Sequence, residues 1–232
     1  MIGFLFSRAT DEAERLLSAE KDRSERLLLN ILPEPIANRL KSGTEKVIAD
    51  RIDEVSVMFA DLVGFTLYAR DREPAAVVSV LNVLFSRFDA RVDALGLEKI
   101  KTIGDAYMVL AGPPTIRPDH LTALADLALE LVQEVRAFRD PDGHRFAVRI
   151  GLHVGPVVTG VIGTRKMAYD VWGDTVNVAS RLESTGLPER IQVSAIVVER
   201  LADRFAFEPR GTTEIKGVGA METFFLTGRK SA

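Results

Sequence analysis

Two short strand patterns separated by only two residues constrain the fold most strongly. Residues 97–103 and 106–111 have the apolar spacing of strands, and only Gly104-Asp105 lies between them. A two-residue connection that contains glycine is typical of an antiparallel β-hairpin. The middle of the chain is therefore predicted to hold a hairpin around which the flanking segments pack.

Amphipathic helices are predicted on both sides of this hairpin. One covers residues 74–95 and begins with Pro74, which suits a first helical position, and the other begins at Pro118 and ends near residue 138. Alternating apolar residues predict half-buried strands at 52–62 and 146–153. The order β-α-β-β-α-β predicts an α+β fold with a ferredoxin-like βαββαβ core, whose sheet carries two helices on one face and leaves the other face open for a site.

A C-terminal α/β extension is predicted to follow this core. Its expected elements are strands at 157–162 and 191–193, helices at 174–184 and 195–201, a strand near Phe205 and a strand over 213–226. The predicted domain organisation is a helical linker over residues 1–45 and one α+β domain over 46–232. With 232 residues, of which 47% are apolar, the chain can bury the core of one such domain.

The N-terminal linker is predicted to be helical from Thr10, which can cap the first turn, until Pro33. A short helix over 36–41 should follow and end at Gly43. The apolar stripe of the first helix needs a partner, because an isolated helix is marginal in water. We favour a parallel coiled coil with a second chain, and packing on its own domain is the alternative. The apolar residues 1–6 suit either the end of a membrane anchor or a disordered start.

Composition excludes several classes of function. The net charge is −3 without a long run of one sign, so we expect no nucleic-acid partner. The chain has no cysteine, which excludes disulfides, thiolate catalysis and cysteine-ligated metals and fits a reducing compartment. There is no run of about 18 apolar residues, so a membrane-spanning helix is not expected.

Two aspartates occur at predicted bends, Asp61 after the first strand and Asp105 in the hairpin. Taken singly, an aspartate at a strand end is ordinary turn chemistry. If both strands are central in the sheet, however, the carboxylates lie close together and repel one another unless cations bridge them. The bend after the first aspartate could also present backbone N–H groups to phosphate oxygens, over Leu62, Val63, Gly64, Phe65 and Thr66.

A third motif lies downstream, at residues 169–183, and places Asn177 and Arg181 four residues apart on one face of a predicted helix. Together with the two aspartate segments, 59–66 and 99–107, it resembles the catalytic domain of class III nucleotidyl cyclases. These enzymes convert ATP or GTP into a 3′,5′-cyclic nucleotide. The resemblance is nearly continuous from residue 51 to 226, and the three motifs occur in the family's order.

The resemblance implies an in-line attack of the ribose 3′-oxygen on the α-phosphorus, with release of pyrophosphate. It assigns two divalent cations, Mg²⁺ or Mn²⁺, to Asp61 and Asp105: one would activate the 3′-hydroxyl and the other would hold the triphosphate. The general base stays open between Asp61, bulk water acting through the metal, and a substrate phosphate.

The resemblance also assigns the residues that hold the nucleotide. Asn177 would orient the ribose, and Arg181 would stabilise negative charge on the α-phosphate in the transition state. Two basic residues in glycine-rich surroundings, Arg149 and Lys216, match the family's contacts to the β- and γ-phosphates.

Substrate choice rests on Lys101 and Asp170. Family members that use ATP carry lysine and aspartate here, whereas guanylyl cyclases typically carry glutamate and cysteine or a similar small residue. Adenine offers an acceptor at N1 and a donor at N6, which suit lysine and aspartate respectively. ATP is therefore the predicted substrate, and GTP should be used poorly.

The family further implies a head-to-tail homodimer with two equivalent sites at the interface, so that a monomer would be inactive. Each site would take the metal-binding pair and Arg149 from one chain, and Lys101, Asp170, Asn177, Arg181 and Lys216 from the other. Because members are often tethered to a membrane upstream of this domain, we expect a cytoplasmic location, on the cytosolic side of the plasma membrane in the full-length protein.

Three other functions can be compared with the motif residues that the sequence retains. A non-catalytic nucleotide-binding or dimerisation module would be expected to lose one of the metal-binding aspartates (Asp61 or Asp105), Asn177 or Arg181, and none is lost. A diguanylate-type cyclase would carry a Gly-Gly-Asp/Glu-Glu-Phe signature at the hairpin, which reads Ile103-Gly104-Asp105-Ala106-Tyr107 instead. A guanylyl cyclase is the nearest alternative, and Lys101 and Asp170 argue against it.

Overall fold

A computed structural model of the protein describes residues 2–43, 45, 47–113, 117–163 and 165–230. Within these residues the chain divides into two compact units. One unit combines residues 1–49 with residues 160–170, and the larger unit combines residues 50–159 with residues 171–232. Each unit is described separately below.

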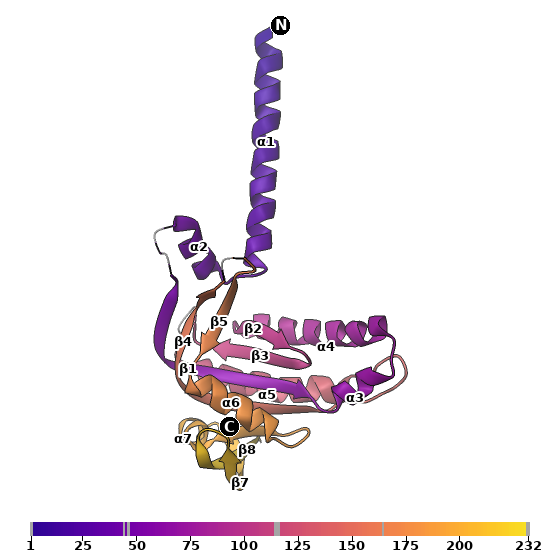
Figure 1. Ribbon diagram of the computed structural model, residues 1–232, viewed down its shortest axis with the longest axis vertical. Helices are drawn as coiled ribbons and strands as arrows, with labels where there is room; N and C mark the ends of the chain where they lie inside the picture. The colour runs from indigo at the N-terminus through magenta and orange to yellow at the C-terminus, as the bar shows by residue number, and fades with distance from the viewer. Residues whose placement is uncertain (1, 44, 46, 114–116, 164, 231–232) are drawn as a thin grey trace. The chain divides into compact units, whose positions relative to one another are not determined.

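The larger unit is organised by a mixed β-sheet (Figure 1). The sheet has the order β2-β3-β1-β4-β6-β8-β7, with β4 and β6 parallel, and β5 (Ala168–Trp172) pairs with β4 outside this path. The strands on the path are β1 (Ala49–Leu62), β2 (Glu98–Ile103), β3 (Ala106–Ala111), β4 (Val148–Ile162), β6 (Ile191–Ser194), β7 (Phe205–Ile215) and β8 (Gly219–Arg229).

The first four of these strands form the predicted ferredoxin-like core. Two helices connect them, α4 (Pro74–Ala94) between β1 and β2 and α5 (His120–Ala137) between β3 and β4. The spatial order β2-β3-β1-β4 places β1 in the centre, next to the hairpin of β2 and β3. The α+β class and the βαββαβ order predicted from the sequence are confirmed.

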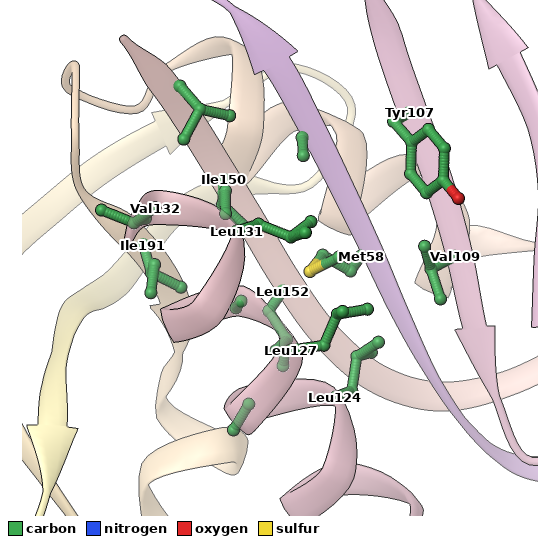
Figure 2. Close-up of a cluster of buried hydrophobic side chains, with 14 of the residues drawn as sticks. Met58, Tyr107, Val109, Leu124, Leu127, Leu131, Val132, Ile150, Leu152 and Ile191 are labelled. Carbon is green, nitrogen blue, oxygen red and sulfur yellow. The ribbon is translucent and has the colours of Figure 1, made fainter. Parts of the chain in front are cut away.

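Packing of α5 on this sheet forms the main core (Figure 2). Leu124, Leu127 and Leu131 follow one another at intervals of three and four, so they share one helix face, and all three are fully buried. They belong to the same apolar cluster as Met58 of β1 and Leu152 of β4. Each such side chain contributes about 1.5–3 kcal/mol through its removal from water.

The second face of the sheet is covered as well, which corrects the expectation of a half-buried β1 and an open face. Residues 55–60 of β1 are all buried. Val55, Val57 and Phe59 form a second apolar cluster, in which Ala179 of α6 (Asp174–Ser184) is also buried. The sequence pattern concealed this layer because α6 follows β1 by more than 100 residues.

Smaller differences concern the ends of elements. The second long helix begins at His120 rather than Pro118, and a short helix, α3 (Phe65–Arg70), and the strand β5 were not predicted. The two strands expected at 146–153 and 157–162 form one strand, β4, which continues through Gly155-Pro156. The carbonyl of Pro156 accepts a hydrogen bond from the Thr175 hydroxyl at 2.6 Å, which holds α6 beside this segment.

The expected strand at 213–226 is two strands, because β7 and β8 turn between residues 215 and 219. The predicted helix at 195–201 is confirmed as α7 (Ala195–Leu201).

The smaller unit contains α1 (Ile2–Leu29) and α2 (Glu34–Ser42). The first helix begins at Ile2 rather than Thr10, since residues 4–9 include no glycine or proline that would stop it. Gly43 ends α2 with a φ of 62°, as predicted.

Leu17 of α1 is 72% exposed, and Leu16 and Leu27 are exposed too, so the apolar stripe of α1 is largely unburied. In the described part of the chain, none of the helices has the length and apolar character that crossing a membrane requires.

One glycine allows α6 to pack closely on β4. A Cβ atom at Gly151 would lie 2.8 Å from the Cα of Glu183, and closer still to the backbone N of Glu183 and the carbonyl oxygen of Ala179. Atoms of the helix backbone cannot move away as a flexible side chain could. The absence of a side chain at this position is therefore a condition for the observed contact.

We expect Gly151→Ala to destabilise the domain by about 2 kcal/mol, because the added methyl must push α6 away from the sheet. Gly228→Ala is the matched control, since a Cβ at Gly228 in β8 meets no atom within 4 Å. Urea unfolding monitored by circular dichroism measures both. Equal stability of the two variants would contradict the close contact.

Candidate active site

The two aspartates singled out in the sequence lie side by side at one end of the central strands. Asp61 is opposite Ala106 in the β1–β3 register, and Asp105 immediately precedes Ala106. Gly104 takes the first position of the two-residue turn with a φ of 63°. The strand order therefore brings the carboxylates together, as the sequence predicted, and their role as metal ligands stays a prediction.

Arg149 of β4 joins this pair. Its terminal NH2 group lies 2.9 Å from Oδ2 of Asp61, whose side chain is only 16% exposed. Its Nε group donates a hydrogen bond to Oε1 of Glu183 at 2.5 Å. Arg149 thus connects β1 with α6, and its predicted contact to the β- and γ-phosphates stays a prediction.

Glu183 is the functional candidate that the sequence analysis missed. It lies in the last turn of α6, and the residue is 7% exposed. Its position within the motif at 169–183 was a usable signal, because a charged residue on the buried face of a helix is rare unless it is paired. The pattern could not identify Arg149 as its partner across 34 residues of sequence.

The electrostatics of the cluster favour bound cations. Burial, and then the charge of Asp105, raise the pKa of Asp61, while Arg149 lowers it. Burial also raises the pKa of Glu183, against the effect of Arg149. Three carboxyl groups thus lie near one another, and one guanidinium pairs with two of them, Asp61 and Glu183. A further positive charge would relieve the remaining repulsion.

The donor set fits a magnesium or manganese site completed by substrate. Mg²⁺ is commonly bound by one or two carboxylates together with phosphate oxygens of the substrate. Among the described residues, three or more acidic, histidine or cysteine side chains do not converge on one point as a preformed metal site would require. Asp61 and Asp105 can therefore hold divalent cations only in combination with other oxygen ligands.

The segment proposed to bind phosphates has two parts, which differ in whether their backbone N–H groups already donate a hydrogen bond. Leu62 ends β1, and the N–H of Val63 donates to the carbonyl of Ala147 at 2.8 Å, so Val63 is already engaged. Gly64 has a φ of 75° and directs the chain into α3. The N–H groups of Phe65 and Thr66 open this helix, where backbone donors lack an intrahelical acceptor.

The predicted ribose and α-phosphate contacts lie on the opposite, exposed side of α6. Asn177 and Arg181 are both exposed, whereas their neighbours Val178, Ala179 and Leu182 on α6 are buried. Across the described residues, the side chains of Asn177 and Arg181 make no hydrogen bond or ion pair with the aspartates. Their predicted roles with the ribose and the α-phosphate stay predictions.

The remaining predicted residues occupy three different elements. Lys101 lies on β2 at an irregularity in the pairing with β3, and Lys216 is exposed in the turn between β7 and β8. Asp170 lies on β5 in the smaller unit, whereas Lys101 belongs to the larger one. The joint role of Lys101 and Asp170 in base selection stays a prediction.

Comparison with known proteins identifies the class of this domain. Residues 47–228 match the family model described as the adenylate and guanylate cyclase catalytic domain. An adenylate cyclase of Mycobacterium tuberculosis is 52% identical over 225 residues, which cover 97% of this chain and 51% of that protein. Human retinal guanylyl cyclase 2 is 43% identical over 92% of this chain and 20% of that protein.

A solved structure points to the same class of domain as the family model and the two relatives. The catalytic core of a rhodopsin-guanylyl cyclase with converted specificity, in complex with ATPαS, has a TM-score of 0.75 and 35% identity, over 78% of this chain and 98% of that one. The shared core and the matching model establish a nucleotidyl cyclase domain. The chain belongs to the adenylate and guanylate cyclase catalytic-domain family. It spans about half the length of the curated mycobacterial relative that it matches.

We expect Asp105→Asn to lower the pKa of Asp61 in the metal-free protein, because the substitution removes the neighbouring negative charge. The folded-state pKa of Asp61 lies above the unfolded value, so the folding stability linked to this group falls as pH rises through the folded-state pKa. The Asp105→Asn variant should lose less stability over the same rise in pH. Carboxyl ¹³C NMR in the presence of EDTA follows the titration. Arg149→Met is the opposing control and should raise the pKa. An Asp61 titration that Asp105→Asn leaves unchanged would refute this arrangement.

Proposed function

We propose that this chain is the catalytic domain of an adenylate cyclase, which converts ATP into 3′,5′-cyclic AMP and pyrophosphate. The observation that supports this most directly is the adjacent pair Asp61 and Asp105, with Arg149 beside it, at one end of the central strands. This arrangement offers oxygen ligands to cations and a guanidinium to the triphosphate within one short stretch of sheet. The reaction is an in-line displacement at the α-phosphorus by the ribose 3′-oxygen.

Residues of the larger unit hold the triphosphate in this proposal. Asp61 and Asp105 bind two divalent cations, Mg²⁺ or Mn²⁺, and the bound cations supply activation of the 3′-hydroxyl and compensation of the charge on pyrophosphate. Arg149 binds the β- and γ-phosphates together with Lys216. The N–H groups of Phe65 and Thr66 point at phosphate oxygens from the start of α3. Positioning and charge compensation account for most of the catalysis in such phosphoryl transfers.

The active site is shared between two chains of a head-to-tail homodimer. Asn177 orients the ribose and Arg181 stabilises the charge that develops on the α-phosphate, from the exposed face of α6. Their exposure, and their lack of contact with Asp61 in the described part of a single chain, support a site that a second chain completes. Two equivalent sites result, and dimerisation becomes a condition of activity.

Lys101 and Asp170 select adenine in this scheme, by donating to N1 and accepting from the N6 amino group. The exposed leucines of α1 pair with the same helix of the second chain as a parallel coiled coil, which transmits a signal from an upstream segment. In the full-length protein that segment includes a membrane anchor, and the catalytic domain lies on the cytosolic side of the plasma membrane.

We expect the purified chain to form cyclic AMP from ATP in the presence of Mg²⁺ or Mn²⁺, with a specific activity that rises with protein concentration because the active species is a dimer. Chromatographic quantification of the product over a range of protein concentrations measures this. GTP should give at least tenfold less product, since its N1 donor faces the Lys101 donor.

The matched variant for the substrate assignment is Lys101→Glu combined with Asp170→Cys, which should shift the preference toward GTP. Preferential use of GTP by the unchanged chain would indicate a guanylyl cyclase instead. Absence of any cyclic product from a confirmed dimer would favour a non-catalytic nucleotide-binding module.

We expect Asp61→Ala and Asn177→Ala chains to be inactive separately and to recover activity when mixed. Random pairing leaves half of the dimers as heterodimers, and each heterodimer holds one intact site, so about a quarter of the unchanged activity should return. Native mass spectrometry confirms that heterodimers form. An inactive mixture in which heterodimers are present would exclude shared sites, and the double variant Asp61→Ala/Asn177→Ala mixed with either single variant is the negative control.

A further inference from the structure

We propose that Glu183 is a positioning residue, which holds Arg149 in the orientation needed to bind the triphosphate at the site to which the same chain contributes Asp61 and Asp105. This inference rests on the proposed function. Glu183 has no role in the sequence analysis, and it does not reach the substrate side of α6 on which Asn177 and Arg181 lie.

The first observation is that Arg149 contacts two carboxylates through different groups of its guanidinium. Its Nε group donates to Glu183 at 2.5 Å, and one terminal NH2 group reaches Asp61 at 2.9 Å. A guanidinium is planar and carries five donors in a fixed fork, so fixing the Nε end sets the plane of the whole group. When Asp61 engages cations, the terminal groups of Arg149 become available to phosphate oxygens while Glu183 retains the Nε end.

The second observation is that Glu183 itself has little freedom. Its side chain is 9% exposed, and the backbone of α6 at residues 179–183 lies against β4 at Gly151, where a side chain would not fit. Gly151 is two residues beyond Arg149 on the same strand, so strand and helix are fixed directly beside the ion pair. The carboxylate is therefore a rigid support, and a water molecule or a surface residue could not replace it equally.

The third observation is that Glu183 is a buried carboxylate close to two others. Burial raises its pKa most, Arg149 lowers it, and the nearby charges of Asp61 and Asp105 raise it further. Buried ion pairs often contribute no net stability compared with apolar residues of similar volume. A role in orienting Arg149 accounts for a buried carboxylate at this position where stability alone does not.

A purely structural ion pair is the competing explanation, and mixed dimers separate the two. One chain carries Asn177→Ala and the other Asp61→Ala, so the heterodimer has a single intact site. That site takes Asp61, Asp105 and Arg149 from the first chain and the exposed face of α6 from the second. Glu183→Gln is then introduced into either the first chain or the second.

Both arrangements contain one Glu183→Gln chain, so a cost to folding or dimerisation occurs in both. We expect kcat/KM for ATP to fall roughly tenfold or more, mainly through a higher KM, when the substitution is in the first chain, as is typical of residues that orient a ligating group. In the second chain, where Glu183 supports the inactive half-site, the loss should be several-fold smaller.

A second measurement tests whether Glu183 acts through Arg149. In the first chain, Glu183→Gln added to Arg149→Lys should reduce kcat/KM by less than about twofold beyond Arg149→Lys alone, because residues that act through one contact are not additive. Glu134→Gln is the matched control, since it removes a carboxylate from an arginine pair between α4 and α5, where Arg91 donates to Glu134 at 2.7 Å.

The outcomes are distinct. Equal losses in the two arrangements, or no loss in either, would overturn the proposal, and so would full additivity with Arg149→Lys. An inactive parent heterodimer without any Glu183 substitution would instead contradict the proposed shared active site. Thermal unfolding of each Glu183→Gln chain verifies that both arrangements compare folded proteins.

Discussion

The close packing of α6 against β4 is the contact on which the rest of the site depends. It requires Gly151, because any side chain there would collide with the backbone of α6 at Ala179 and Glu183. The contact places Ala179 of α6 in the second apolar cluster, which also holds Val55, Val57 and Phe59 of β1. It also fixes the rotation of α6, so that Glu183 faces the sheet while Asn177 and Arg181 face outward. One packing contact thereby assigns opposite sides of a single helix to different tasks.

Electrostatic repulsion gives the inward side its chemical character. Asp61, Asp105 and Glu183 bring three carboxyl groups to a partly buried region that contains one guanidinium, Arg149. The fold tolerates this arrangement because β1, β3, β4 and α6 are held by apolar packing on both faces of the sheet. Carboxylates that packing holds close together are suitable ligands for divalent cations, because a bound cation offsets the repulsion between them.

The sequence predicted the parts of the structure that depend on local pattern. The hairpin around Gly104-Asp105 and the helix that starts at Pro74 follow from turn chemistry and periodicity, and the βαββαβ order then places Asp61 next to Asp105. What the sequence could not supply were contacts across long separations. The Arg149–Glu183 pair and the packing of Ala179 near β1 arise from tertiary contacts. So does the hydrogen bond from Thr175 of α6 to Pro156, which lies where β4 continues through Gly155-Pro156.

The division of α6 into two faces has a consequence for the architecture of the enzyme. A helix about 10 Å in diameter separates the groups on its opposite sides, so unless α6 rotates, Asn177 and Arg181 face away from the Arg149–Glu183 pair of the same chain. Rotation is blocked by the backbone contact at Gly151 and by the burial of Val178 and Leu182. In the proposed chemistry the exposed face of α6 therefore serves a nucleotide held by a second chain, which is why the proposal includes a homodimer.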